Sequence, residues 1–436
     1  MKRKTALLCA LLACAYLWVF LVLQYAQPRT ITLRIGLFAG SNWNVPQGDS
    51  YAFLDTVAAR FEATHPGVKI RYVSGILQED YSEWLAEQEL SGTMPDLFFL
   101  PSEDFALYAG LDALRDLTPF IEADPACDLA GFYPAPLADG IEDGRYYALP
   151  VECVPRLMFV NKTLLSREGI PLPHDGWTWE DFLAICRRVT RDTDGDGRVD
   201  QFGVYGYTWE DAVVTSGATL FWDQGRASRF ADARVEDALR FLIDLHQLPE
   251  IREARERDFD LGRVAFRPFN FAAYRAYRPY PWRIKKATDF EWECVRLPKG
   301  PAGANTSPIQ TLLMAMSAQT SHKDLAWEFL KAISLEKENQ HLVLEKTAAL
   351  PVRRDVLEAA TPEEIFGAGT GESDRSPHAI SAVLDDGKSP DRFQGYAAVM
   401  RLADQRIQEI VDGVRPFDNA LNQLQKEVNA LLQETP

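Results

Sequence analysis

The sequence predicts an α/β fold in which helices connect the strands of a parallel sheet. Two observations support this fold class. Strand and helix patterns alternate along the first hundred residues, and the 436-residue chain is 47% apolar, which is enough to fill more than one core.

The first predicted elements follow one another in strand–helix order. Residues 30–38 alternate apolar and polar side chains, as a half-buried strand does, and residues 51–64 have helical spacing that stops at His65-Pro66-Gly67. Residues 68–73 predict a second strand, residues 81–85 belong to a helix, and residues 95–100 predict a short buried strand. Strands separated by helices in this way pair in parallel.

The later part of the chain is mainly helical. Residues 146–150 and 156–160 predict two strands with an irregular piece between them. Helical patterns then occupy residues 181–189, 235–246, 324–333 and 417–432. Residues 361–377 are rich in Gly, Ser and Glu and predict a surface loop.

The N-terminus carries an export signal. Lys2, Arg3 and Lys4 precede an unbroken apolar run over residues 6–23, which is about the length that spans a bilayer. An uncleaved anchor is the favoured interpretation. A lipoprotein with Cys14 as the lipidated residue and an ordinary cleaved secretion signal are the alternatives. All three place the body of the protein outside the cytoplasm, in the periplasm or at the cell surface.

Charge and cysteine usage exclude several classes of protein. A net charge of -17 argues against general affinity for nucleic acid or anionic lipid. Beyond the N-terminal segment, Cys127, Cys153, Cys186 and Cys294 form no C-x-x-C pair, so a zinc site is not expected. These cysteines are either disulfide-bonded, with three connectivities open, or buried free thiols.

Catalytic motifs are absent from the sequence. It has no G-x-S-x-G nucleophile elbow, no G-x-x-x-x-G-K phosphate loop and no H-E-x-x-H zinc motif, and its six histidines are scattered singly. We therefore expect a binding protein and not an enzyme. A glycoside hydrolase with paired carboxylates is a less favoured alternative, because any acidic chain supplies candidate pairs.

Several segments in order resemble one known family. Each is short, but together they extend over nearly all of residues 30–430: F-E-A-T-H-P-G-V-K-I, M-P-D-L-F-F-L, G-L-D-A-L-R-D-L-T-P-F-I, Y-A-L-P-V-E-C-V-P-R-L-M-F-V-N-K-T-L-L, W-T-W-E-D-F-L, L-G-R-V-A-F and A-L-P-V-R-R-D. On these segments the chain resembles the extracellular solute-binding proteins of bacterial ABC importers, in the carbohydrate-binding group that includes maltose-binding protein.

The resemblance implies a two-lobed periplasmic-binding-protein fold (type II) with a ligand cleft between lobes that hinge strands connect. Residues 1–28 would be the signal or membrane anchor. Lobe I would comprise residues 30–152 and 297–345, and lobe II residues 153–296 and 346–436. Hinge closure would bury a carbohydrate, and importer permease subunits would recognise the closed monomer. A carbohydrate-sensing or adaptor protein is the alternative within the same fold.

Candidate ligand-binding residues follow from the chemistry of sugars. Pyranose faces stack on aromatic rings, whereas hydroxyl groups pair with carboxylate, amide or guanidinium groups. Strand ends and the resemblance direct one set of such side chains toward the cleft. This set is Trp43, Asn44, Glu79, Asp104, Glu152, Arg156, Trp222 and Phe271. For each aromatic the alternative is core packing, and for each acid it is a solvated surface position.

Residues 263–286 interleave seven basic residues with seven aromatic residues. Such a mixture occurs in nucleic-acid-binding surfaces, but the acidic balance and the location outside the cytoplasm argue against that function. Two interpretations remain. The segment forms an aromatic cleft wall whose arginines favour an acidic saccharide, or it is a packed segment with a basic exposed edge.

The stretch D-T-D-G-D-G-R-V-D-Q-F-G, residues 192–203, resembles a calcium loop that related binding proteins often carry at this place. An EF-hand loop uses oxygen ligands at positions 1, 3, 5, 7 and 9 and a bidentate Glu at 12. The expected ligands are Asp192, Asp194, Asp196, the carbonyl of Arg198, and Asp200. Position 12 is Gly203, so we expect Asp200 to close the site. A bound Ca²⁺ would fix a surface turn in lobe II, and an acidic turn without metal is the alternative.

Overall fold

The computed structural model describes residues 30–43, 45, 49–222, 225–277, 290–366 and 377–434. The predicted anchor at residues 1–28 and the candidate ligand residue Asn44 lie outside this set. None of the helices in the described part of the chain combines the length and apolar character needed to cross a bilayer.

A nine-stranded sheet runs through the molecule in the order β2-β1-β3-β12-β6-β10-β7, and β11 and β13 also pair with β6. In the first lobe, β1 (Ile31–Gly36) is parallel to β2 (Val68–Tyr72) and to β3 (Leu97–Pro101). Strand β12 (Ile309–Met316) is antiparallel to β3. β3 is buried along its whole length, as expected for an inner strand covered on both faces.

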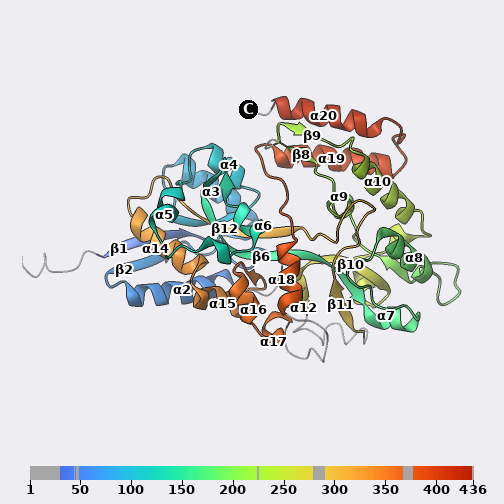
Figure 1. Cartoon of the computed structure of the whole chain (residues 1–436), viewed down its shortest axis with the longest axis horizontal. Coiled ribbons are helices and arrows are strands. Elements are labelled where there is room, and N and C mark those ends of the chain that lie inside the picture. The colour runs from blue at the N-terminus through green and yellow to red at the C-terminus, as the bar shows by residue number, and fades with distance from the viewer. Residues whose placement is uncertain are drawn as a thin grey trace, which may run out of the picture.

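Helices surround the first-lobe sheet (Figure 1). Their bounds are α2 (Ser50–Thr64), α3 (Tyr81–Leu90), α4 (Phe105–Gly110), α5 (Thr118–Ala123), α6 (Pro134–Ala138), α14 (Lys323–Ser334) and α15 (Lys337–Lys346). Two short 3-10 turns, η1 (Gln78–Asp80) and η2 (Leu129–Gly131), and the hairpin β4 (Ile141–Glu142) and β5 (Arg145–Tyr146) complete this part.

Strand β6 (Ala148–Asn161) joins the two lobes, and Figure 1 shows it running from one to the other. Its first part pairs with β12 up to Pro155, and its second part pairs with β10 from Arg156 onward. The two strands predicted over residues 146–160 are therefore one strand, and the predicted irregular piece between them is wrong. A bulge between Leu312 and Leu313 of β12 lets the pairing continue through this segment.

The second lobe has a smaller sheet. β10 (Val264–Asn270) is antiparallel to β6 and parallel to β7 (Phe202–Val204), and β11 (Trp292–Val295) pairs with the other edge of β6. The hairpin β8 (Phe221–Trp222) and β9 (Ala227–Ser228) stands apart. The helical elements of this lobe are α7 (Lys162–Arg167), α8 (Trp179–Val189), α9 (Trp209–Ser216), α10 (Ala233–His246), η3 (Ile251–Glu253), α11 (Glu256–Asp260), α12 (Phe271–Tyr277), α19 (Tyr396–Val411) and α20 (Ala420–Glu434).

The tetrapeptide T-W-E-D occurs twice and begins a helix each time. Thr178 and Asp181 form a capping box at the start of α8, and Thr208 and Asp211 form the same box at the start of α9. The Trp179 ring of the first copy stacks on Phe241 of α10 at 4.7 Å between ring centroids. Local sequence therefore fixes where both helices start, and aromatic packing fixes where α8 lies.

The expected division at residue 345 does not match the packing. β13 (Leu350–Pro351) pairs with the first-lobe part of β6, α16 (Arg354–Ala359) contacts β13 and α15, and α18 (Pro377–Asp385) contacts α16 and α6. Residues 346–385 thus pack on the first lobe. Only α19 and α20 return to the second lobe, where they contact α10 and β9.

Two further predictions are settled in the described residues. Within the predicted loop at residues 361–377, α17 (Pro362–Phe366) is a short helix because Ile365 and Phe366 are buried; residues 367–376 lie outside the described set. Cys127, Cys153 and Cys186 are free thiols, and Cys153 and Cys186 are buried. Burial raises the pKa of both buried thiols well above its usual value, as expected of unreactive core cysteines.

Candidate functional site

The carboxyl ends of the strands in both lobes flank the point where β6 crosses. β6 is antiparallel to β12, which is antiparallel to β3, so β6 leaves the first lobe at the edge where β1, β2 and β3 end. In the second lobe β10 ends at Asn270, which pairs with Arg156, and β7 ends at the same edge. Ligands of α/β proteins bind outside such strand ends.

Three predicted ligand residues follow the first-lobe strands at this edge. Trp43 lies after β1, Glu79 after β2 and Asp104 after β3. The loops after β1 and β2 are joined by a 2.7 Å bond from the Ala39 amide to the Ile76 carbonyl. Ser82 donates a 2.5 Å hydrogen bond to Asp104, which joins the segments after β2 and β3. Glu79 is exposed and Asp104 is half-buried.

Trp43 and Glu152 meet at the base of this edge. The indole Nε1 donates a 2.9 Å hydrogen bond to Glu152 Oε1, and only 6% of Trp43 and 4% of Glu152 are exposed. Glu152 Oε2 is buried without a hydrogen-bond partner. Burial raises the pKa of Glu152 to about 7, although the polar side chains of Thr347 and Trp43 and the charge of Arg275 favour the ionised form. Glu152 therefore has one acceptor oxygen still to be satisfied.

Arg275 of α12 is a residue that the sequence analysis did not single out within the basic segment. Its guanidinium donates to the carbonyls of Leu344 and Ala349, and to that of Glu364 at 3.2 Å. These carbonyls belong to the segments that pack on the first lobe, so Arg275 fastens α12 to them. Burial lowers its pKa to about 10, and Glu152 opposes this shift.

Arg156, the next predicted residue, forms a two-point ion pair with Asp211. Its Nε and Nη2 donate to the two carboxylate oxygens, the second at 2.9 Å. Asp211 is 1% exposed and also caps α9, whereas 31% of the Arg156 side chain is exposed. The pair places an oriented guanidinium at the second-lobe edge.

The two predicted aromatic residues of the second lobe differ. Trp222 of β8 is 53% exposed, and the Arg229 guanidinium lies 3.9 Å from its ring centroid. Phe271 is fully buried, stacked on Tyr274 at 5.5 Å and edge-on to Phe366 at 5.9 Å. The structure contradicts the predicted ligand contact of Phe271, because β10 runs directly into α12 and this ring fills the core.

The segment between α18 and α19 adds residues that the sequence analysis missed. Asp391 and Glu210 both reach solvent, yet burial raises the pKa of Asp391 to about 6 and also raises that of Glu210. Burial, followed by the charges of Asp391 and Glu210, raises the pKa of Tyr396 to about 12. Glu210 belongs to α9, Asp391 to the segment before α19 and Tyr396 to α19, so residues far apart in sequence are grouped here and no local signal predicts it.

Arg392 in the same segment is tied to the first lobe. Its Nη2 lies 2.7 Å from Asp139 Oδ2, and its Nη1 donates to the Asp139 carbonyl at 3.2 Å. Both side chains are largely buried. The next residue, Phe393, packs on Phe221 of β8 at 4.9 Å between ring centroids. The segment is therefore held by both lobes.

Most of the basic and aromatic segment that the structure describes is packed, whereas Arg263 is exposed. Arg267 is 7% exposed, lies 3.6 Å from the Phe269 ring centroid and pairs with Glu256 at 2.8 Å. With Arg275 buried as well, these arginines support the packed-segment interpretation. Residues 278–289 of this segment lie outside the described residues.

One groove in the described residues lies elsewhere. A groove of about 870 Å³ lies between α5, α14 and the end of β12. Met316 at that end of β12 pairs with Leu97 at the start of β3, so the groove is at the opposite edge from the candidate ligand residues. Within it, Lys331 lies 2.5 Å from Asp124 and 3.0 Å from Glu328.

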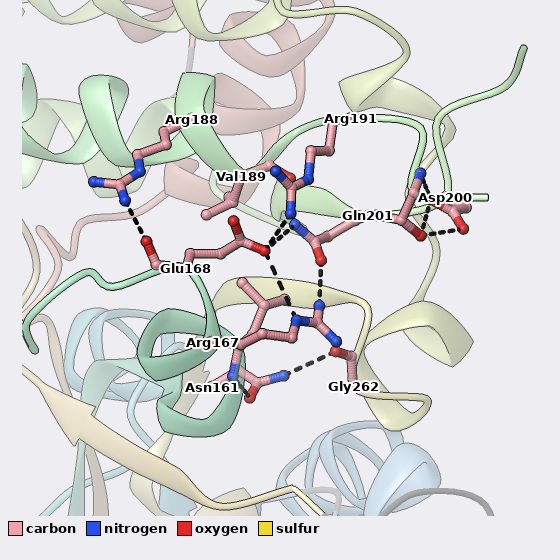
Figure 2. A network of polar contacts seen from close by, with 11 residues as sticks. Asn161, Arg167, Glu168, Arg188, Val189, Arg191, Asp200, Gln201 and Gly262 are labelled. Carbon is pink, nitrogen blue, oxygen red and sulfur yellow. Dashed lines mark hydrogen bonds and ion pairs between the residues drawn. The ribbon is translucent and has the colours of Figure 1, made fainter. Parts of the chain in front are cut away.

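Residues 192–200 form the acidic loop, and an antiparallel backbone bridge between Arg191 and Gln201 closes its base (Figure 2). Glu168 holds this base: its carboxylate accepts from Arg191 at 2.7 Å and from Gln201 at 3.4 Å. Arg167 donates to the Gln201 side chain, which ties the loop to α7. These hydrogen bonds fix the base of the loop to the end of α7 in the second lobe.

Carboxylate oxygens of Asp192, Asp194 and Asp196 all lie within 4.8 Å of one another, which suits a divalent cation. Asp192 accepts backbone hydrogen bonds from Gly197 and Gly195, and these lower its pKa. Asp200 does not join this group, because its carboxylate accepts from the amide and hydroxyl of Thr193. In the structure Asp200 is therefore engaged by Thr193, and its role as a closing ligand stays a prediction.

Comparisons with known proteins agree with this architecture. A family model described as bacterial extracellular solute-binding protein matches residues 45–340. An uncharacterized lipoprotein of Streptomyces antibioticus is 26% identical over 330 residues, which cover 69% of this chain and 66% of the lipoprotein, just under two thirds of its length.

Two solved structures share the fold. The sugar-binding protein MalE of Xanthomonas citri has a TM-score of 0.75 and 20% identity, with 92% of this chain and 98% of that chain covered. The cyclic alpha-maltosyl-1,6-maltose binding protein of Arthrobacter globiformis has a TM-score of 0.75 and 18% identity, with 93% and 99% covered. The likeness confirms the predicted two-lobed α/β fold.

Proposed function

The chain belongs to the bacterial extracellular solute-binding protein family, and from this membership we propose that it binds a carbohydrate for an ABC importer. The observation that carries the proposal is the collection of polar and aromatic side chains at the strand ends on both sides of the β6 crossing. The sugar-binding proteins with the same fold support the choice of ligand class.

In the proposed mechanism the lobes rotate about the chain segments that connect them, including β6, and close on the ligand. Trp222 offers an exposed ring for the apolar face of a sugar. Asp104, Glu210 and Asp391 accept hydrogen bonds from hydroxyl groups, and Arg156, held by Asp211, donates them. The ligand stabilises the closed state because only that state brings both edges into contact with it. No bond of the ligand is made or broken.

We also propose that Asp192, Asp194 and Asp196 hold a structural Ca²⁺. The cluster of their oxygens supports this, and the Arg198 carbonyl and water would supply further oxygens. The ion would offset the repulsion of three neighbouring carboxylates and stiffen the loop. The loop is anchored through Glu168 to α7 and α8, and not to the strand ends, so the ion has no direct part in ligand binding.

The proposed location is the outer face of the cytoplasmic membrane, with residues 1–28 as the anchor or signal. The family description and the lipoprotein relative support it. The permease subunits of the importer would be the protein partners, and the binding protein would act as a monomer.

A saccharide panel tests the proposal. Purified protein lacking residues 1–28 is titrated with neutral, amino and acidic saccharides, while calorimetry records binding and chromatography records products. We expect stoichiometric binding that leaves the ligand intact. Shorter products would contradict the binding function and favour a glycoside hydrolase. Deleting this gene or the permease genes should cause the same growth defect on the bound sugar; a defect from this gene alone would favour a sensor or adaptor.

A further inference from the structure

The two edges that flank the β6 crossing are both acidic. Glu103 and Asp104 follow β3 in the first lobe. Glu210 at the start of α9 and Asp391 before α19 lie on the other side, close enough that both act on the phenol of Tyr396. In the described residues no lysine or arginine forms an ion pair with any of these four carboxylates.

The arginines of this region are already neutralised. Arg156 pairs with Asp211, which is 1% exposed, and Arg392 pairs with Asp139, which is 5% exposed. Each pair sums to zero charge and is fixed by burial of its acid, so neither guanidinium is free to balance another anion. Lys388 lies near enough to Asp391 to lower its pKa, but it is one cation against four acids.

A separate observation is a buried hydrogen-bond acceptor, a carboxylate oxygen, to which no group donates a hydrogen bond. Glu152 Oε2 is buried at the base of the first-lobe edge and has no hydrogen-bond partner, while Oε1 is occupied by Trp43. An ammonium group has three N–H donors and no acceptor, so it satisfies carboxylate oxygens without leaving a lone pair unmatched.

Closure brings the two acidic edges toward each other. Like charges that approach in a medium of low dielectric constant repel, so closure around an anionic ligand is opposed and closure around a cation is favoured. A site of this kind discriminates by repulsion as well as by attraction. Resting on the carbohydrate-binding function proposed above, we propose that the preferred ligand is a saccharide bearing a protonated amine, and that uronates and sugar phosphates are rejected.

The test compares saccharides that differ only in charge. Glucose-, galactose- and mannose-series oligomers are titrated in their amino, N-acetylated and uronate forms at low and high salt. We expect the amino form of the preferred series to bind about tenfold more tightly than its N-acetylated form at low salt. The advantage should shrink at high salt, because mobile ions screen the carboxylates. The uronate form should not bind.

Variants separate a charge effect from a shape effect. In the double variant Glu210→Gln, Asp391→Asn the ratio of amino-form affinity to N-acetylated-form affinity should fall from about ten to about one, because both carboxylate charges are removed while an acceptor oxygen remains at each position. Asp418→Asn, an exposed change elsewhere on the second lobe, is the matched control and should keep the advantage. Melting curves establish that each variant is folded.

The outcomes are distinct. Equal binding of the amino and N-acetylated forms, or binding of the uronate, overturns this inference and leaves carbohydrate binding intact. Retention of the amine preference in the double variant also overturns it. Failure of every saccharide to bind contradicts the proposed function together with the inference.

Discussion

Replacing Glu152 with Gln tests the electrostatics at the base of the site. Glutamine keeps the shape of the side chain and an oxygen that accepts the Trp43 hydrogen bond, but it cannot ionise. Burial raises the pKa of Glu152 from 4.5 to about 7 in the folded protein. A difference of this size corresponds to about 3 kcal/mol, at about 1.4 kcal/mol per pKa unit.

The sign follows from the two pKa values. Between pH 4.5 and 7 the unfolded chain loses the Glu152 proton before the folded chain does. The free energy of unfolding therefore falls as pH rises through this window, and the full loss is present above pH 7. The difference in unfolding free energy between wild type and Glu152→Gln isolates this group, because every other titrating group is common to both proteins.

Urea unfolding at several pH values between 4.5 and 8 measures this difference. We expect wild type to lose about 3 kcal/mol relative to Glu152→Gln across the window. Glu79→Gln, at an exposed carboxylate of the same edge, is the control and should change the unfolding free energy by less than about 0.5 kcal/mol. A difference between wild type and Glu152→Gln that does not vary with pH would refute the reasoning, because Glu152 would then be no harder to ionise in the folded protein than in the unfolded one.

Three further predictions concern other parts of the molecule. Chelation of Ca²⁺ should lower the melting temperature of wild type, but not that of the Asp192→Asn, Asp194→Asn variant, and should leave saccharide affinity nearly unchanged; a large loss of affinity would contradict a structural role. Arg392→Met should lower the free energy of unfolding by about 3 kcal/mol in urea titrations, because Asp139 is left buried without its partner. A change below about 0.5 kcal/mol would show that this ion pair does not hold the segment between α18 and α19 in place. Trp222→Ala should weaken saccharide binding about tenfold in calorimetry and leave the melting temperature unchanged, because its ring is mostly exposed; unchanged affinity would remove Trp222 from the site.

The first elements of the chain were predictable because their signals are local. The strand at Ile31–Gly36 and the helix at Ser50–Thr64 lie where alternation and helical spacing place them. The break at residues 151–155 was predicted wrongly, because pairing with β12 and burial keep this segment extended despite Pro155 and the preceding Pro150. The pattern of residues 151–155 does not show that β12, more than 150 residues later in the chain, pairs with them.

In the candidate site, too, some residue positions were predictable from local sequence and others were not. The positions of Trp43, Glu79 and Asp104 at the first-lobe edge were predictable because each lies in the segment after a strand, and strand ends are where α/β proteins bind ligands. Phe271 also follows a strand, but the chain turns into α12 and its ring packs in the core. Burial of one ring depends on which distant residues cover it, so position after a strand was not enough.

The sequence by itself determined the α/β class and the order of the first elements. It also determined the helix starts at the two T-W-E-D boxes and the acidic loop, because each of these features depends on residues that are neighbours in the chain. Only the tertiary structure decided the course of the chain after residue 345, the pairing of Arg392 with Asp139, and the gathering of Glu210, Asp391 and Tyr396. These depend on contacts between residues up to about 250 positions apart, where the packing of whole lobes, and not local propensity, sets which groups meet.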